Sequence, residues 1–127
     1  MAGVKALAGP QTIYPLTATT ATHSVPFTNA ANYRGIIMVV ESTAETDTAE
    51  VTPSIEAPDG NGGWEAIWTA AAAISSVATT DYLIYPGASG GNYVEVDGIP
   101  MPRSGRFTFT HADADSLTYS VVVQWLR

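Results

Sequence analysis

The sequence predicts an all-β protein, an antiparallel β-sandwich or jelly roll of about eight or nine short strands. Apolar and polar residues alternate in several short segments, as they do in strands whose successive side chains point to opposite faces. Gly, Pro, Asn and Asp separate these segments at short intervals. Only 13% of the residues are charged, whereas about 25% is usual. The polar surface must therefore come largely from Thr and Ser, and β-branched Thr favours strands.

The clearest alternation lies at the C-terminal end of the chain. Residues 117–126 read as a strand with one strongly apolar face, made of Leu117, Tyr119, Val121, Val123 and Trp125. In the segment before it, Phe107 and Phe109 share a face, and the short polar stretch 112–115 joins the two strands. We expect these segments to form a hairpin whose apolar face is covered by the rest of the chain.

Weaker patterns predict further strands at 11–16, 20–27, 50–58, 64–68, 81–85 and 93–96. The apolar run 35–42 predicts a strand covered on both faces, and its β-branched residues argue against the alternative of a helix. The Gly-rich segment 59–63 predicts a turn that joins 50–58 and 64–68 into a hairpin. Residues 69–80, which contain a run of Ala, predict an irregular connection.

A chain of 127 residues predicts one domain. We expect an N-terminal arm at residues 1–15, either disordered or ordered on a neighbouring molecule, followed by a single β-sandwich domain at 16–127. The absence of cysteine excludes disulfides and thiolate metal sites. No stretch approaches the ~20 apolar residues of a membrane span, and residues 1–11 lack the apolar run of a signal peptide. We therefore expect no membrane partner and assembly in the cytoplasm.

The charge balance argues against nucleic acid as a partner. The net charge is −7, and the basic residues Lys5, Arg34, Arg103, Arg106 and Arg127 are scattered along the sequence. Proteins that bind nucleic acid carry a basic patch that neutralises phosphates. We expect no such binding here.

No catalytic or metal-binding motif is present. His23 and His111 lack the spacing of metal ligands. Asp113 and Asp115 are interpreted as turn residues rather than as a weak cation site, and the segment 59–63 as a turn rather than a calcium loop. The aromatic residues Trp64, Trp68, Tyr82, Tyr85 and Trp125 fit core positions better than a sugar or peptide site. We therefore expect no cofactor, no metal and no enzyme activity, although a carboxylate pair brought together by folding stays open.

Four segments together resemble a family of small virion proteins. They are RGIIMVVES at 34–42, VTPSIEAPDGNGGWEAIW at 51–68, YLIYPG at 82–87 and IPMPRSGRFTFTHADADSLTYSV at 99–121. This pattern resembles structural proteins of tailed bacteriophages, of the head decoration (cement) type. The most specific part is 110–119. The sequence departs from the pattern at Ser104 and Gly105, where the family has a bulkier, often aromatic residue before the Arg.

The resemblance implies a protein on the exterior of the virion head that binds the major capsid protein, stabilises the shell and commonly forms homotrimers. As contact residues we expect Val4, Leu7, Ile13 and Tyr14 in the arm, and Ile36 and Met38 in the apolar run, whose one face a sister subunit would cover. Two alternatives remain: a tail-associated or receptor- and glycan-binding structural protein, and a small jelly-roll hydrolase or isomerase.

Overall fold

A computed structural model describes residues 3–127, which form ten β-strands and no helix. Within this range, no helix is therefore present that has the length and apolar character needed to cross a membrane. The strands, in chain order, are β1 (Val4–Lys5), β2 (Pro10–Thr19), β3 (His23–Thr28), β4 (Gly35–Glu45), β5 (Val51–Pro58), β6 (Trp64–Thr69), β7 (Ala78–Ile84), β8 (Glu95–Asp97), β9 (Ser104–His111) and β10 (Leu117–Leu126).

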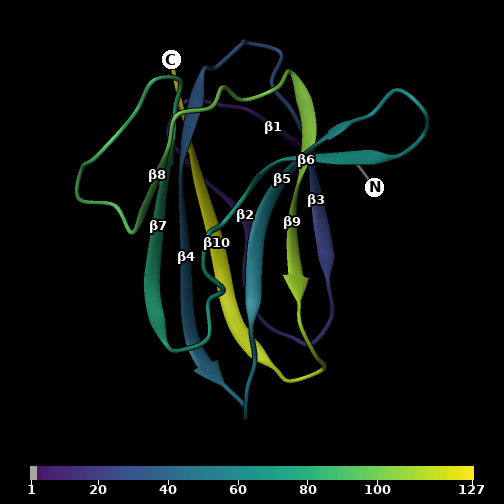
Figure 1. Cartoon of the computed structure of the whole chain (residues 1–127), viewed down its shortest axis with the longest axis vertical. Helices are drawn as coiled ribbons and strands as arrows, with labels where there is room; N and C mark the ends of the chain where they lie inside the picture. The colour runs from purple at the N-terminus through teal and green to yellow at the C-terminus, as the bar shows by residue number, and fades with distance from the viewer. Residues whose placement is uncertain (1–2) are drawn as a thin grey trace.

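The strands form two packed five-stranded sheets, so the predicted β-sandwich is confirmed (Figure 1). Sheet A has the order β1-β3-β9-β5-β6, and sheet B has the order β2-β10-β4-β7-β8. All pairings are antiparallel except those of the short edge strands β1 with β3 and β8 with β7. Without β1 and β8, eight strands remain in two sheets, which is the strand count of a jelly roll. That finer classification stays a prediction.

The predicted C-terminal hairpin is wrong. Strands β9 and β10 lie in different sheets: β9 pairs with β3 and β5, whereas β10 pairs with β2 and β4. The connection 112–116 therefore crosses from one sheet to the other. The face of β10 predicted to be buried is confirmed, because Leu117, Tyr119, Val121, Val123 and Trp125 are at most 3% exposed.

The other predicted hairpin is confirmed: β5 and β6 pair antiparallel around the turn at 59–63. Asp59 shapes this turn, because its Oδ1 accepts hydrogen bonds from the backbone N–H groups of Asn61 and Gly63. The tip of the hairpin projects beyond the body of the sandwich (Figure 1). The apolar run forms β4, a strand between β10 and β7, so the predicted strand is confirmed. Its outward-facing Ile37 and Val39 are only half-buried, so the predicted cover on both faces is not complete in the single subunit.

The core lies between the sheets and is built from the inward faces of their central strands. Phe107 and Phe109 of sheet A are fully buried, as are Met38 and Tyr119 of sheet B. Each such side chain contributes about 1.5–3 kcal/mol relative to its exposed state. The aromatic prediction holds for Trp68, Tyr82 and Trp125, whereas Trp64 is 40% exposed.

The N-terminal part of the predicted arm forms strands on the sandwich. Val4 and Lys5 pair in parallel with Phe27 and Thr28, and β2 pairs antiparallel with β10. The expected boundary at residue 15 falls inside β2. Residues 1 and 2, which also belong to the predicted arm, lie outside the described residues.

Candidate binding site at one end of the sandwich

The fold gathers the basic residues at one end of the sandwich. We call this the upper end, as drawn in Figure 1; it contains the loops 29–34, 86–88 and 98–103 and the C-terminus. Arg34 precedes β4, Arg103 precedes β9 and Arg127 follows β10. Lys5 pairs with Thr28 at this end, and Arg106 lies two residues into β9 from Ser104. All 5 basic residues of the chain therefore lie in the upper half.

Acidic residues dominate the opposite, lower end, which contains the connections 45–50 and 112–116. These connections carry Glu45, Asp47, Glu50, Asp113 and Asp115 and no Lys or Arg. Basic residues that are scattered along the sequence thus share one end of the sandwich, because alternating strand directions bring chain-distant residues together. The expectation of no nucleic-acid partner stays a prediction.

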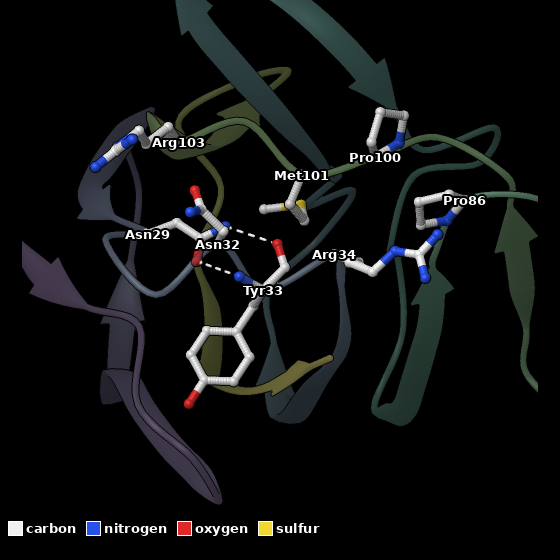
Figure 2. A pocket seen from close by; sticks show the side chains of 8 residues that line it. All are labelled: Asn29, Asn32, Tyr33, Arg34, Pro86, Pro100, Met101 and Arg103. Atoms are coloured by element: carbon white, nitrogen blue, oxygen red, sulfur yellow. Dashed lines mark hydrogen bonds between the residues drawn. The ribbon is translucent and has the colours of Figure 1, made fainter.

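A hollow of about 380 Å³ opens at the upper end, and Arg34 and Arg103 lie on opposite sides of it with their guanidinium groups pointing away from one another (Figure 2). Both arginines are exposed. The hollow is lined by Asn29, Asn32, Tyr33, Arg34, Pro86, Pro100, Met101 and Arg103, so its lining contains two cations and no carboxylate. In Figure 2, Met101 lies between the two arginines. The lining of the hollow thus combines apolar residues with asparagines and with two arginines whose charged groups point outward.

Hydrogen bonds fix the loops that carry these arginines. The side chain of Asn29 is 1% exposed, and its Oδ1 accepts a 2.8 Å hydrogen bond from the Tyr33 N–H. Its Nδ2 donates to the Tyr33 carbonyl at 2.8 Å (Figure 2). The Asn29 N–H donates to the Arg103 carbonyl, and the Met101 N–H donates to the Arg34 carbonyl. The backbones of both arginines are therefore held in place by hydrogen bonds to neighbouring loops.

An apolar groove adjoins this hollow. It has a volume of about 370 Å³ and is lined by Ile67, Ile99, Pro100, Met101 and Pro102, so Pro100 and Met101 belong to both. Ile67, from β6, is 37% exposed. Leu7 is 55% exposed; it follows Ala6, whose N–H donates to the carbonyl of Thr28 at the upper end. Cationic and apolar surface are thus continuous there.

The predicted contact residues lie in different environments. Leu7 is exposed, and Val4 and Tyr14 are half-buried. Ile13 is 7% exposed, and Ile36 and Met38 are fully buried in the core. The side chains of Ile36 and Met38 point inward from β4, so they belong to the interior of this subunit and not to its surface. The neighbours that point outward from the same strand are Ile37 and Val39, both half-buried.

A second polar arrangement lies inside the lower half of the sandwich. The Nε2 atoms of His23 and His111, both from sheet A, lie 2.7 and 3.0 Å from the hydroxyl oxygen of Tyr119, from sheet B. The Tyr14 ring stacks on His23 with centroids 4.2 Å apart. Burial lowers the pKa of both histidines, and the proximity of His111 lowers that of His23 further. The cluster is therefore built for neutral imidazoles.

Folding also brings two carboxylates together, at the edge strand β8. The Trp68 indole N–H lies 2.6 Å from Oδ2 of Asp97 and 3.1 Å from Oε2 of Glu95, and the Ala71 N–H donates to Oε1 of Glu95. Burial raises the pKa of Glu95, and Asp97 raises it further. These hydrogen bonds connect the end of β6, in sheet A, to β8, in sheet B, and so hold the two sheets together at this edge.

The outer face of sheet A carries a polar network. Oε1 of Glu56 accepts hydrogen bonds from Nε of Arg106 and Oγ1 of Thr108, both at 2.6 Å. The Arg106 guanidinium lies 4.4 Å from the centre of the Trp64 ring. Hydrogen bonds from Thr108 and Arg106 lower the pKa of Glu56, although burial opposes them. This is the one ion pair among residues 3–127.

The aspartates of the lower end form part of turns. Oδ1 of Asp113 accepts the Asp115 N–H, and Oδ2 of Asp115 accepts the N–H and hydroxyl of Thr48. Within residues 3–127, no group of three or more His, Cys, Asp or Glu side chains is arranged to hold a metal ion. The turn interpretation of Asp113 and Asp115 is therefore the one that their hydrogen bonds support.

No protein-family model, curated protein or solved structure matches this chain. The candidate site is therefore supported by the geometry of its residues and not by any related protein. Reasoning from the sequence missed both the arginine hollow and the histidine cluster. One feature of the sequence pointed to the arginine hollow: Arg34, Arg103 and Arg127 each flank the end of a strand. This feature shows that the three residues share one end of the sandwich only when the direction of each strand is known.

Proposed function

We propose that this protein is a structural component of a tailed-bacteriophage virion, a decoration protein that binds the outer surface of the head and stabilises it. Two kinds of observation support the proposal. The virion assignment rests on the resemblance of the segments between residues 34 and 121 to this family. The mode of attachment rests on the concentration of cationic and exposed apolar surface at the upper end.

The upper end is the proposed contact with the major capsid protein. It carries Leu7 from the N-terminal segment, Ile67 from β6 and the hollow between Arg34 and Arg103. Such a surface combines apolar area with charges that fix orientation, as protein interfaces do. Many copies bound to a symmetric shell multiply a modest contact, because each copy joins neighbouring capsid subunits.

Self-association into a homotrimer is the second part of the proposal. Ile37 and Val39 point outward from the middle of sheet B, and their neighbours across the sheet are Leu83 on β7 and Val122 on β10. All four are half-buried in the single subunit. This apolar strip is the surface that a sister subunit would cover, in place of the inward-pointing Ile36 and Met38.

The location of the protein in the virion tests the proposal. Antibodies against the purified protein are applied to virions of the encoding phage, and heads are expected to be labelled. Labelling of the tail alone, or binding of the purified protein to a glycan array, supports the alternative of a tail-associated or receptor-binding protein and overturns the decoration proposal. Sedimentation velocity at micromolar concentration tests the trimer, and a stable monomer contradicts it.

A variant links self-association to the strip on sheet B. Val39→Glu places a charge in the strip and is expected to give monomers that keep the fold. Thr110→Glu is the matched control, because Thr110 is an exposed residue of β9, in the other sheet. Monomers from both variants, or trimers from both, would mean that the strip is not the interface.

A further inference from the structure

We infer that Asn61, at the tip of the hairpin of β5 and β6, is a site of spontaneous covalent modification, at which the side-chain amide is converted to a carboxylate. The site consists of Asn61 and Gly62, in the turn at 59–63 that joins the two strands. This inference goes beyond the proposed function and does not depend on it. Water is the co-reactant, and the products are aspartate and isoaspartate at position 61.

The reaction is an attack by the backbone on the neighbouring side chain. The Gly62 nitrogen loses its proton to hydroxide and attacks the side-chain carbonyl carbon of Asn61. A five-membered cyclic imide forms, and the amide nitrogen of Asn61 leaves as ammonia. Water then opens the imide at either carbonyl carbon. Opening at the side-chain carbon gives aspartate, opening at the backbone carbon gives isoaspartate, and no group is oxidised or reduced.

The first argument is the hydrogen bonding of the turn. Oδ1 of Asp59 accepts the N–H groups of Asn61 and Gly63 at 2.8 and 3.0 Å, and the Asp59 N–H donates to the Gly63 carbonyl. Between these bonded groups, the N–H of Gly62 donates to no acceptor among residues 3–127. The attacking nitrogen therefore carries a proton that is open to water, and no hydrogen bond to it has to break first.

The second argument is the space around the reacting atoms. Asn61 and Gly62 are both exposed, and the tip of the hairpin projects beyond the body of the sandwich (Figure 1). Gly62 adopts a left-handed conformation with φ of 84°, and a Cβ atom at this position would meet nothing within 4 Å. Ring closure requires the backbone to rotate, and at such a tip the rotation displaces no packed side chain.

The third argument is the contrast with the other three asparagines, which are followed by Ala or Tyr and not by Gly. A side chain on the following residue crowds its nitrogen. Asn29 is also 1% exposed, and both ends of its amide are held by Tyr33, so its reaction needs local unfolding. Asn92 is exposed but precedes Tyr93. Asn61 is thus the asparagine at which exposure and an unhindered nitrogen coincide.

Peptide mapping by mass spectrometry tests the inference. The purified full-length protein is incubated in mildly alkaline buffer, beside an acetylated and amidated peptide of residues 57–64. We expect Asn61 in the protein to be converted within about threefold of the rate in the peptide, because the folded turn does not protect it. Asn29 and Asn92 should be converted at least about tenfold more slowly than Asn61. Slower conversion of Asn61 than this, or equally fast conversion of Asn92, overturns the inference.

Two variants then assign the modified position. Anion-exchange chromatography separates the product, because each conversion adds one negative charge. Asn61→Gln is expected to abolish the main acidic species, since the longer side chain would have to close a less favourable six-membered ring. Asn92→Gln is the matched control, because it changes another exposed asparagine of a loop, and the acidic species should form at the wild-type rate. Persistence of this species in Asn61→Gln, or its loss in both variants, contradicts the assignment to Asn61.

Discussion

Nε2 of His23 lies 2.7 Å from the hydroxyl oxygen of Tyr119, across the interior of the sandwich, although the two residues are 96 positions apart in the chain. His111 reaches the same hydroxyl from the neighbouring strand at 3.0 Å. One hydroxyl can donate to one neutral imidazole and accept from the other. If both imidazoles were protonated, both would donate to the hydroxyl oxygen and their charges would repel each other. Neither could then accept the hydroxyl proton of Tyr119.

This arrangement predicts that acidification destabilises the protein. The pKa of both histidines is lowered in the folded state, so below about pH 6.5 the unfolded chain binds more protons than the folded chain. The stabilisation is complete above that pH and is lost as the pH falls toward the folded-state pKa. We expect the free energy of unfolding, measured with urea, to decrease from pH 7.5 to pH 5.5.

The double variant His23→Gln, His111→Gln is the control for this pH dependence. It should flatten the profile between pH 5.5 and 7.5. The raised pKa of Glu95 works in the opposite direction, because a carboxyl group that is more easily protonated when folded loses stability as the pH rises. A wild-type profile that rises on acidification, or a double variant with an unchanged profile, contradicts the role of the histidines.

Removal of the shared hydroxyl gives a second prediction. Tyr119→Phe keeps the fully buried ring and deletes the group that both histidines contact. We expect a loss of about 1–2 kcal/mol in the free energy of unfolding, because two hydrogen bonds disappear but the half-exposed imidazoles find water. Tyr85→Phe is the comparison, since its exposed hydroxyl donates only to the C-terminal Arg127 carbonyl. Equal losses in the two variants would contradict the prediction.

The third prediction concerns Gly105, a buried residue of β9. A Cβ atom there would overlap the Glu56 carbonyl oxygen and lie 2.9 Å from the Phe27 ring. The Phe27 ring thus occupies space that a larger side chain at position 105 would need. We expect Gly105→Ala to cost about 1–3 kcal/mol of stability, measured by thermal or urea unfolding.

Ser104→Ala is the matched control for Gly105, because Ser104 is the exposed neighbour in β9. Its effect should stay within about 0.5 kcal/mol. A Gly105→Ala protein as stable as the wild type would show that β5 and β9 separate readily, in conflict with the close approach at Glu56.

The fourth prediction concerns the carboxylates at β8. Trp68→Phe removes the indole N–H that donates to Glu95 and Asp97. The pKa of Glu95 should then rise further, because a hydrogen bond that favours its charged form is lost while burial and Asp97 remain. The carboxyl carbon of Glu95, titrated by NMR, measures this change. Trp64→Phe, on the exposed side of β6, should leave it unmoved.

Local patterns were sufficient to predict much of the fold but not which strands pair. The alternation in 117–126 identified the buried face of β10, because burial follows from side-chain direction alone. The same alternation is compatible with a hairpin and with a crossing between sheets, so the partner of β9 was predicted wrongly. Strand β9 does not pair with β10 because both of its edges are paired with other strands, one with β3 and the other with β5. These two partners lie far from β9 in the sequence.

The candidate site was beyond prediction for the same reason. Arg34 and Arg103 are 69 positions apart by their numbering, and only the strand directions bring them to one hollow. His23 and His111 belong to no local motif, and their common partner Tyr119 belongs to the other sheet. The types of the residues identify candidates for the site, whereas the strand topology decides which of these residues lie close together.

The positions of β9 and β10 have a consequence for how the sheets assemble. Each is an interior strand of its sheet, between β3 and β5 or between β2 and β4, and each follows both of its partners in the chain. Strand β2 and the group β4-β7-β8 therefore stay separate parts of sheet B until β10 inserts between them, and β9 has the same place between the two parts of sheet A. Because these pairings join segments far apart in the sequence, we expect them to make folding slow.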